Sequence, residues 1–177
     1  MDTNWFNYPD FYDFISKIEG YRVFVEVGVF KGNSISYLAN KLRHKEAMVF
    51  AVDLWEDTPA FKDNPELMED VKILSSLYNE QLTKTNTRHL ISDIKQDSAE
   101  AAHVFQDDSV DFVFLDANHD HDWVKRDILA WLPKVRKGGI IAGHDATRPE
   151  VERVLKNVFP DAVGKDVESS VWYKIIL

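Results

Sequence analysis

The chain contains no cysteine among its 177 residues, which excludes disulfide bonds, cysteine-ligated zinc and thiol catalysis. It also lacks any apolar run of about eighteen residues, so the sequence predicts no membrane-spanning helix. The N-terminus, Met1-Asp2-Thr3-Asn4, is not basic and leads into no apolar segment. We therefore expect no secretory signal and a cytoplasmic protein.

Positive charge is scarce, because 21 Lys and Arg residues face 30 Asp and Glu residues and leave a net charge of -9. Such a field repels phosphate backbones, so we expect no nucleic-acid partner, although a local pocket can still bind a small anion. Hydrophobic residues make up 45% of the chain, which predicts a folded protein with a core. The length predicts one domain over residues 1–177.

Short β-branched runs alternate with helical stretches along the chain, a pattern typical of a parallel α/β sheet. We predict a Rossmann-like, seven-stranded, mostly parallel sheet with helices on both faces. The last two strands are expected to form an antiparallel hairpin within residues 162–177. The other predicted strands are residues 21–27, 48–53, 91–96, 110–115 and 139–143, and the predicted helices are 10–18, 33–43, 65–83, 98–105, 122–135 and 148–159.

Acidic residues stand at the end of every predicted parallel strand. Ligands of open α/β sheets bind outside the carboxyl ends of the strands. One such acid is often only a helix N-cap, but five at the same edge favour a ligand site. The five are Glu26, Asp53, Asp97, Asp116 and Asp145.

The loop after the first strand contains two glycines but not the dinucleotide fingerprint. G-x-G-x-x-G would need glycine at Phe30 and at Asn33. Gly28 allows a sharp turn and Gly32 a close backbone approach. The start of the following helix favours a carboxylate, and the amino-acid end of S-adenosylmethionine carries one. The ammonium group at the same end needs an acceptor or counter-charge, which Glu26 can provide.

The next two strand ends suit the rest of an adenine nucleoside. An acid in the position of Asp53 can accept both ribose hydroxyl groups. Asp97 and Ser98 lie where an adenine edge would be recognised. The acids and glycines in this order predict a nucleoside-bearing cofactor.

Two histidines accompany the last acids. His119 follows Asp116 closely, and an imidazole there can remove a proton from a substrate hydroxyl near neutral pH. His121 is a weaker candidate for the same role. His144 and Asp145 can join Asp116 around Mg²⁺ or Mn²⁺, or Asp145 can instead cap the helix that follows.

These motifs, taken in order, resemble the class I S-adenosylmethionine-dependent methyltransferases of the methyltransferase 24 group. That group is related to the macrocin-type O-methyltransferases and more distantly to catechol O-methyltransferase. The resemblance runs from about Tyr21 to Phe159. The matching segments are residues 26–34, 51–55, 97–101, 110–119 and 137–145.

The resemblance implies S-adenosylmethionine as cofactor and a possible Mg²⁺ ion at Asp116, His144 and Asp145. It places His119 where relatives carry a catalytic Lys or His, beside Asp116 as the second catalytic residue. Position 144 departs from the pattern, because the well-understood metal enzymes have an acid there. The expected cofactor contacts are Glu26, Gly28, Val29, Gly32, Asn33, Ser34, Asp53, Leu54, Trp55, Asp97, Ser98 and Asp116.

The predicted activity is O-methylation of a small hydroxylated acceptor, either a sugar or a secondary metabolite. Two alternatives stay open: a nicotinamide-dependent oxidoreductase, and a cofactor-binding module without catalysis. Several aromatic residues can line an acceptor pocket or form the contact of a homodimer. They are Trp5, Phe6, Trp55 and Phe61.

Overall fold

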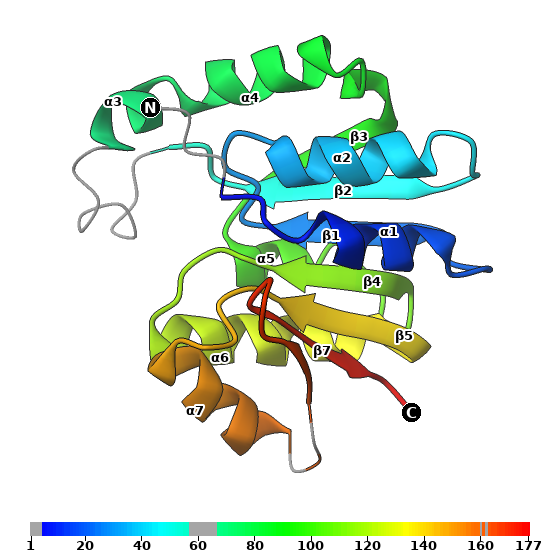
Figure 1. The fold of residues 1–177 in the computed structure, drawn as a ribbon, viewed down its shortest axis with the longest axis vertical. Coiled ribbons are helices and arrows are strands. Elements are labelled where there is room, and N and C mark those ends of the chain that lie inside the picture. Colours follow the sequence, from blue (N-terminus) through cyan, green and yellow to red (C-terminus); the bar gives the residue numbers. More distant parts are fainter. Residues whose placement is uncertain (1–4, 57–66, 160, 162) are drawn as a thin grey trace.

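The computed structural model describes residues 5–56, 67–159, 161 and 163–177. Its centre is one seven-stranded sheet in the order β3-β2-β1-β4-β5-β7-β6 (Figure 1). The strands are β1 (Val23–Val27), β2 (Met48–Asp53), β3 (Ile91–Lys95), β4 (Val110–Leu115), β5 (Val135–Gly143), β6 (Gly164–Asp166) and β7 (Val171–Ile175).

The pairing of the strands confirms the predicted fold class. Strands β1 to β5 run parallel to one another, while β7 pairs antiparallel with β5 and with β6. The chain starts at β1, moves outward through β2 and β3, and then returns to β4 on the other side of β1. This reversal creates a topological switch point between the carboxyl ends of β1 and β4, where ligands of such sheets bind.

Helices cover both faces of the sheet. The helices α1, α2 and α4 pack on one face around Phe24 and Phe112, and α5, α6 and α7 pack on the other around Val25 and Val113. The helices are α1 (Pro9–Lys17), α2 (Asn33–Leu42), α3 (Met68–Lys72), α4 (Leu74–Lys84), α5 (Ser98–Ala102), α6 (His121–Trp131) and α7 (Pro149–Val158), with 3₁₀ turns η3 (Arg88–Leu90) and η4 (Leu132–Lys134). Every helix in the described part of the chain is too short or too polar to cross a bilayer.

Strand alternation decides which polar groups share a face. Phe24, Phe112 and Ile140 belong to the core under α1 and α2. Because side chains alternate with a period of two along a strand, the positions two or four residues further on point to the same face. Glu26, Asp116 and His144 occupy such positions, so the face covered by α1 also carries the polar groups at the carboxyl edge.

The predicted helix over residues 65–83 is two helices, and residues 65 and 66 lie outside the described part of the chain. Ile73 separates α3 from α4 with φ -122° and ψ 20°. The break directs α3 toward the first loop, where Lys31 Nζ pairs with Asp70 at 2.6 Å. This ion pair connects the first loop with α3, a contact that the hydrophobic periodicity of the sequence does not predict.

The predicted boundary before the fifth strand was also wrong. β5 begins at Val135, and α6 ends at Trp131, because Val135 pairs with Val110 across a register shift. Gly138, with φ 77°, lies inside the strand, and a Cβ atom on Gly139 would come within 2.9 Å of the Asp111 carbonyl oxygen. The two glycines therefore form a bulge rather than a break. Smaller differences are that α5 ends at residue 102 and β1 begins at residue 23.

Candidate active site

The first loop turns at Gly28, which has φ 84°. A Cβ atom there would collide with the backbone of Asp116 and Ala117, so glycine lets the ends of β1 and β4 approach each other. The predicted sharp turn is therefore present, and it forms the floor of the switch point.

Gly32 is the N-cap residue of α2 and has φ 83°. A Cβ atom on Gly32 would lie 2.8 Å from the Tyr78 ring and 2.9 Å from Leu82. The close approach that this glycine allows is therefore to α4. The helix itself begins at Asn33, with Ser34 in its first turn, as predicted.

Asp53 ties the first two loops together. Its Oδ2 atom accepts the backbone N–H groups of Val29 at 2.8 Å and Phe30 at 2.9 Å, and its Oδ1 atom accepts that of Trp55 at 2.8 Å. Phe30 and Trp55 have φ 50° and 48°, a left-handed conformation rare for such residues. Burial raises the pKa of Asp53, and these N–H donors oppose the rise. The sequence analysis assigned this carboxylate to ribose but did not predict its backbone partners.

Glu26 is almost fully buried, with 1% exposure. Tyr12 donates its hydroxyl to one carboxylate oxygen at 2.6 Å, and Ser34 donates to the other at 2.5 Å. Burial raises the pKa of Glu26 to about 8 against the opposing effect of the two hydroxyl donors. Without a cation beside it, this carboxyl group holds its proton at neutral pH.

Asp116 follows β4 and receives a hydrogen bond from the Tyr8 hydroxyl at 3.3 Å. Burial raises its pKa to about 7, since the nearby His144 only partly opposes that rise and the charge of Asp145 adds to it. Asp116 is thus a second carboxyl group, partly buried, whose pKa lies near neutral pH.

His144 lies across from Asp116, and its ring is held from the other side. Its Nε2 atom lies 3.0 Å from the Ser169 carbonyl oxygen and 3.1 Å from Asn7 Oδ1, both acceptors, so Nε2 carries a proton. Its Nδ1 atom then faces Asp116 at 3.7 Å and Asp145 at 3.8 Å. Ligand atoms of Asp116, His144 and Asp145 lie within 4.8 Å of one another, so the three predicted metal ligands are brought together.

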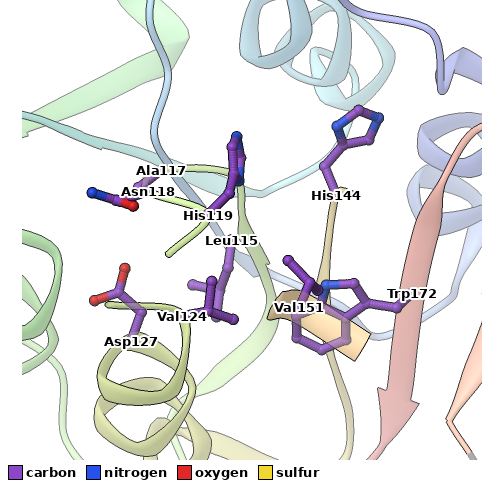
Figure 2. A pocket seen from close by; sticks show the side chains of 9 residues that line it. All are labelled: Leu115, Ala117, Asn118, His119, Val124, Asp127, His144, Val151 and Trp172. Atoms are coloured by element: carbon purple, nitrogen blue, oxygen red, sulfur yellow. The ribbon is translucent and has the colours of Figure 1, made fainter. Parts of the chain in front are cut away.

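His119 lies beside the same cluster, with its Nε2 atom 3.1 Å from Asp145 Oδ2. Figure 2 shows the His119 and His144 rings pointing the same way, away from Val124 and Val151. Burial lowers the pKa of His119 below its ordinary 6.5, although Asp145 opposes the change. His119 is therefore a neutral imidazole at neutral pH.

For both His144 and Asp145, neighbouring charges move the pKa in the direction opposite to the effect of burial. Burial lowers the pKa of His144, but Asp145 and Asp116 outweigh it and the pKa is raised. Burial raises the pKa of Asp145, but His144 and His119 outweigh it and the pKa is lowered. Asp145, which has φ 57°, is thus the ionised carboxylate between the two imidazole rings.

A family model described as a methyltransferase domain, methyltransferase 24, matches residues 25–146, more than half of the chain. The chain belongs to this family. It is a class I S-adenosylmethionine-dependent methyltransferase domain, as the resemblance implied. No curated protein matches the sequence.

Solved structures of other methyltransferases share its fold. The O-methyltransferase NovP has a TM-score of 0.69 at 14% identity, over 88% of this chain and 72% of NovP. TomG from Streptomyces achromogenes, an O-methyltransferase of tomaymycin synthesis solved in complex with S-adenosylmethionine, has a TM-score of 0.66 at 12% identity, over 96% of this chain and 79% of TomG. An S-adenosylmethionine-dependent O-methyltransferase from Thermotoga maritima has a TM-score of 0.60 at 21% identity, over 88% of this chain but only 51% of its own length. At these identities the likeness establishes the fold alone.

In this methyltransferase, Asp97 and Ser98, which we predicted to contact adenine, both bond to other residues of the chain. Asp97 accepts the Ala99 N–H at 3.1 Å and pairs with Arg126 at 2.7 Å. Ser98 accepts the indole N–H of Trp131 at 3.2 Å. Both side chains thus have partners within the chain, and their contact with adenine stays a prediction.

Arg126 also lies 3.3 Å from Asp127, an acid that the sequence analysis did not single out. Asp127 is 4% exposed, and burial raises its pKa to about 6. It lines a small cavity beneath the two histidines, together with Asn118, Val124 and Trp172 (Figure 2). The cavity holds about 10 Å³, roughly the room of one water molecule.

The aromatic residues expected at a pocket or dimer contact differ in how exposed they are. Trp55 is buried at 7% exposure against the Tyr78 ring, 4.6 Å away. Phe6 packs in a cluster with Tyr8 and other rings. Trp5 is 51% exposed and stacks on Phe30. Phe61 lies outside the described residues.

Sequence reasoning missed the polar contacts made by the N-terminal segment and by the β6–β7 turn. Tyr8 and Tyr12 lie four residues apart, which places them on one helical face, and this spacing was an available signal. Nothing local in the sequence connects Asn7 or Ser169 to His144, because the contact of Asn7 with His144 spans 137 positions.

Proposed function

We propose that this methyltransferase transfers the methyl group of S-adenosylmethionine to a hydroxyl group of a small acceptor, either a sugar or a secondary metabolite. The observation that supports this best is His119. It is a neutral imidazole, 28% exposed, next to the partly buried carboxylate of Asp145 beside the switch point. A general base for a hydroxyl proton needs this combination of protonation state and access.

The buried carboxyl groups fit the proposed cofactor. Glu26, which is buried, and Asp53 and Asp116, which are partly buried, all have pKa values that desolvation raises. S-adenosylmethionine carries a sulfonium and an ammonium group, and a cation favours the ionised form of a nearby carboxylate. We assign Glu26 and Ser34 to the amino-acid end, Asp53 to the ribose and Asp97 to the adenine. The bound cofactor would supply the electrophilic methyl group.

His119 would take the proton of the acceptor hydroxyl. Its Nε2 atom lies 3.1 Å from Asp145 Oδ2, and we infer that this carboxylate keeps the ring proton on Nε2, which leaves the lone pair on Nδ1. Asp145 fixes the ring and stabilises the imidazolium that forms, as carboxylates paired with catalytic histidines do. Holding the two reactants in line would supply much of the acceleration.

A divalent cation at Asp116, His144 and Asp145 is part of this proposal. The three ligand atoms are close enough, and the Nε2–H of His144 donates to a carbonyl group, which is the usual way a metal-binding histidine is oriented. Such an ion would stabilise the alkoxide of the acceptor. Because one ligand is imidazole rather than oxygen, we propose Mn²⁺ in preference to Mg²⁺.

The cation proposal predicts that the protein binds Mn²⁺. His144→Ala should lower the Mn²⁺ affinity by about tenfold or more. The free Mn²⁺ signal in electron paramagnetic resonance measures binding without any need for an acceptor. Asp120→Asn, which changes an exposed acid in the neighbouring loop, should leave the Mn²⁺ affinity unchanged. Equal affinity in the wild type and in His144→Ala would exclude this site.

The experiment that tests the proposed function is calorimetric titration followed by an acceptor screen. The protein should bind S-adenosylhomocysteine and should not bind NAD, whereas NAD binding alone would support the oxidoreductase alternative. Hydroxylated sugars and phenols are then screened with a radiolabelled methyl donor. Cofactor binding with no transfer to any acceptor would favour the non-catalytic alternative.

A further inference from the structure

The N-terminal segment, residues 5–12, contacts the ends of three central strands. Asn7 reaches His144 after β5, and Tyr8 reaches Asp116 after β4. Tyr12 reaches Glu26 in β1. Figure 1 shows this segment, in dark blue, running past the carboxyl end of β1 into α1. A single short segment therefore supplies hydroxyl or amide groups to His144, Asp116 and Glu26.

Tyr8 is held with little freedom. Its side chain is 3% exposed, and its ring packs 4.8 Å from Phe114, 4.9 Å from Phe6 and 5.2 Å from His144. This packing fixes the position of the ring and therefore of its hydroxyl group, which donates to Asp116 Oδ2 at 3.3 Å. The Ser34 hydroxyl group also contacts the Tyr8 hydroxyl group.

The hydroxyl groups and carboxyl groups form one chain across the switch point. Tyr12 bonds Glu26, Glu26 bonds Ser34, Ser34 contacts Tyr8, and Tyr8 bonds Asp116. Among the described residues, neither carboxyl group is paired with a Lys or Arg side chain. In this structure the single protons of the three hydroxyl groups point to Glu26 and Asp116. When an ammonium group takes the place of a donor beside these carboxyl groups, the hydroxyl groups of Tyr8 and Ser34 can rotate their protons toward a carboxylate. The cluster thus matches an α-amino-acid group.

We propose that Tyr8 binds the amino-acid end of the cofactor by donating its hydroxyl group to the cofactor carboxylate, next to Ser34. This inference rests on the proposed function and adds a binding residue that lies outside the matched family segment, residues 25–146. Tyr12, through its 2.6 Å hydrogen bond, is a positioning residue that orients Glu26 toward the ammonium group.

The test compares two ligands that differ only in the carboxylate: S-adenosylhomocysteine and its decarboxylated analogue, S-adenosyl-3-thiopropylamine. Tyr8→Phe keeps the ring contacts and removes the hydroxyl group. This variant should bind S-adenosylhomocysteine about tenfold more weakly, as expected for the loss of a hydrogen bond to a charged group. Its affinity for the decarboxylated analogue should stay within about twofold of the wild-type value. Calorimetry measures both affinities.

Tyr37→Phe is the matched control. Tyr37 belongs to the same aromatic cluster, 5.2 Å from Phe6, but its hydroxyl group donates to Asp13 in the middle of α1 and not to Glu26 or Asp116. Neither ligand should bind more weakly to this variant. The thermal midpoint of each variant shows that it is folded.

Two outcomes would overturn the role of Tyr8. Equal losses for the two ligands would show a structural role only, and unchanged binding of S-adenosylhomocysteine would show no role. If the wild-type protein bound neither ligand, the proposed function would fail first and this inference with it. Should Tyr8→Phe not fold, the wild-type protein still tests the inference, because equal affinity for S-adenosylhomocysteine and the decarboxylated analogue would exclude a hydrogen bond from Tyr8 to the carboxylate.

Discussion

Glu26→Gln is expected to weaken binding of S-adenosylhomocysteine by on the order of 100-fold. The wild-type carboxylate is buried at 1% exposure between two hydroxyl donors, and a neutral amide cannot pair with the ligand ammonium group. Calorimetry at pH 8 measures the loss. Glu19→Gln, which changes an exposed acid after α1, is the control and should bind normally.

The same substitution should change how the ligand-free protein responds to pH. The pKa of Glu26 is raised by burial from 4.5 to about 8, so the folded state keeps a proton that the unfolded state loses. Stability is therefore greatest below about pH 4.5 as far as this group is concerned, and it falls as the pH rises toward 8. The loss is on the order of a few kcal/mol.

Glu26→Gln cannot ionise and should lose this contribution. Urea unfolding at pH 5 and pH 8, without ligand, should therefore show a smaller decrease in the free energy of unfolding for Glu26→Gln than for the wild type. Parallel decreases in the two proteins would mean that Glu26 is already ionised in the folded state.

His119→Ala should lower turnover by about 10²- to 10⁴-fold, the range of a general base, while the affinity for S-adenosylhomocysteine stays the same. His119 lies 3.1 Å from Asp145 at the edge of the site and has no assigned contact with the cofactor. Turnover is measured with radiolabelled S-adenosylmethionine and an acceptor found by screening.

His121→Ala is the control for this prediction. His121 pairs with the exposed Asp122 at 2.8 Å on the first turn of α6, so its removal should leave turnover unchanged. If His119→Ala retained full turnover while His121→Ala lost it, the general base would have been assigned to the wrong histidine.

Much of the fold could be predicted from local sequence patterns. The strands at residues 48–53 and 110–115 have the predicted bounds, because strongly apolar β-branched runs leave little choice of conformation. The regions that misled were those where distant contacts decide. Ile73 interrupts a periodic helix beside an ion pair of Asp70 with the first loop, and Gly138 continues a strand although glycine usually ends one.

The sequence by itself determined that Glu26, Asp53, Asp116 and Asp145 would meet at one edge. Parallel strands always present their carboxyl ends together, so a residue's position after a strand is sufficient information. It likewise determined that His119 would lie near these acids.

Only the tertiary structure decided which partner each of these groups has. Tyr8 meets Asp116 across 108 positions, and Arg126 meets Asp97 across 29. Such pairings depend on how helices pack on the two faces of the sheet, and no local period of the sequence encodes that packing. The burial that raises the pKa values of Glu26 and Asp116 arises in the same way, because Tyr8 and Tyr12, at the start of α1, pack over them from a distant part of the sequence.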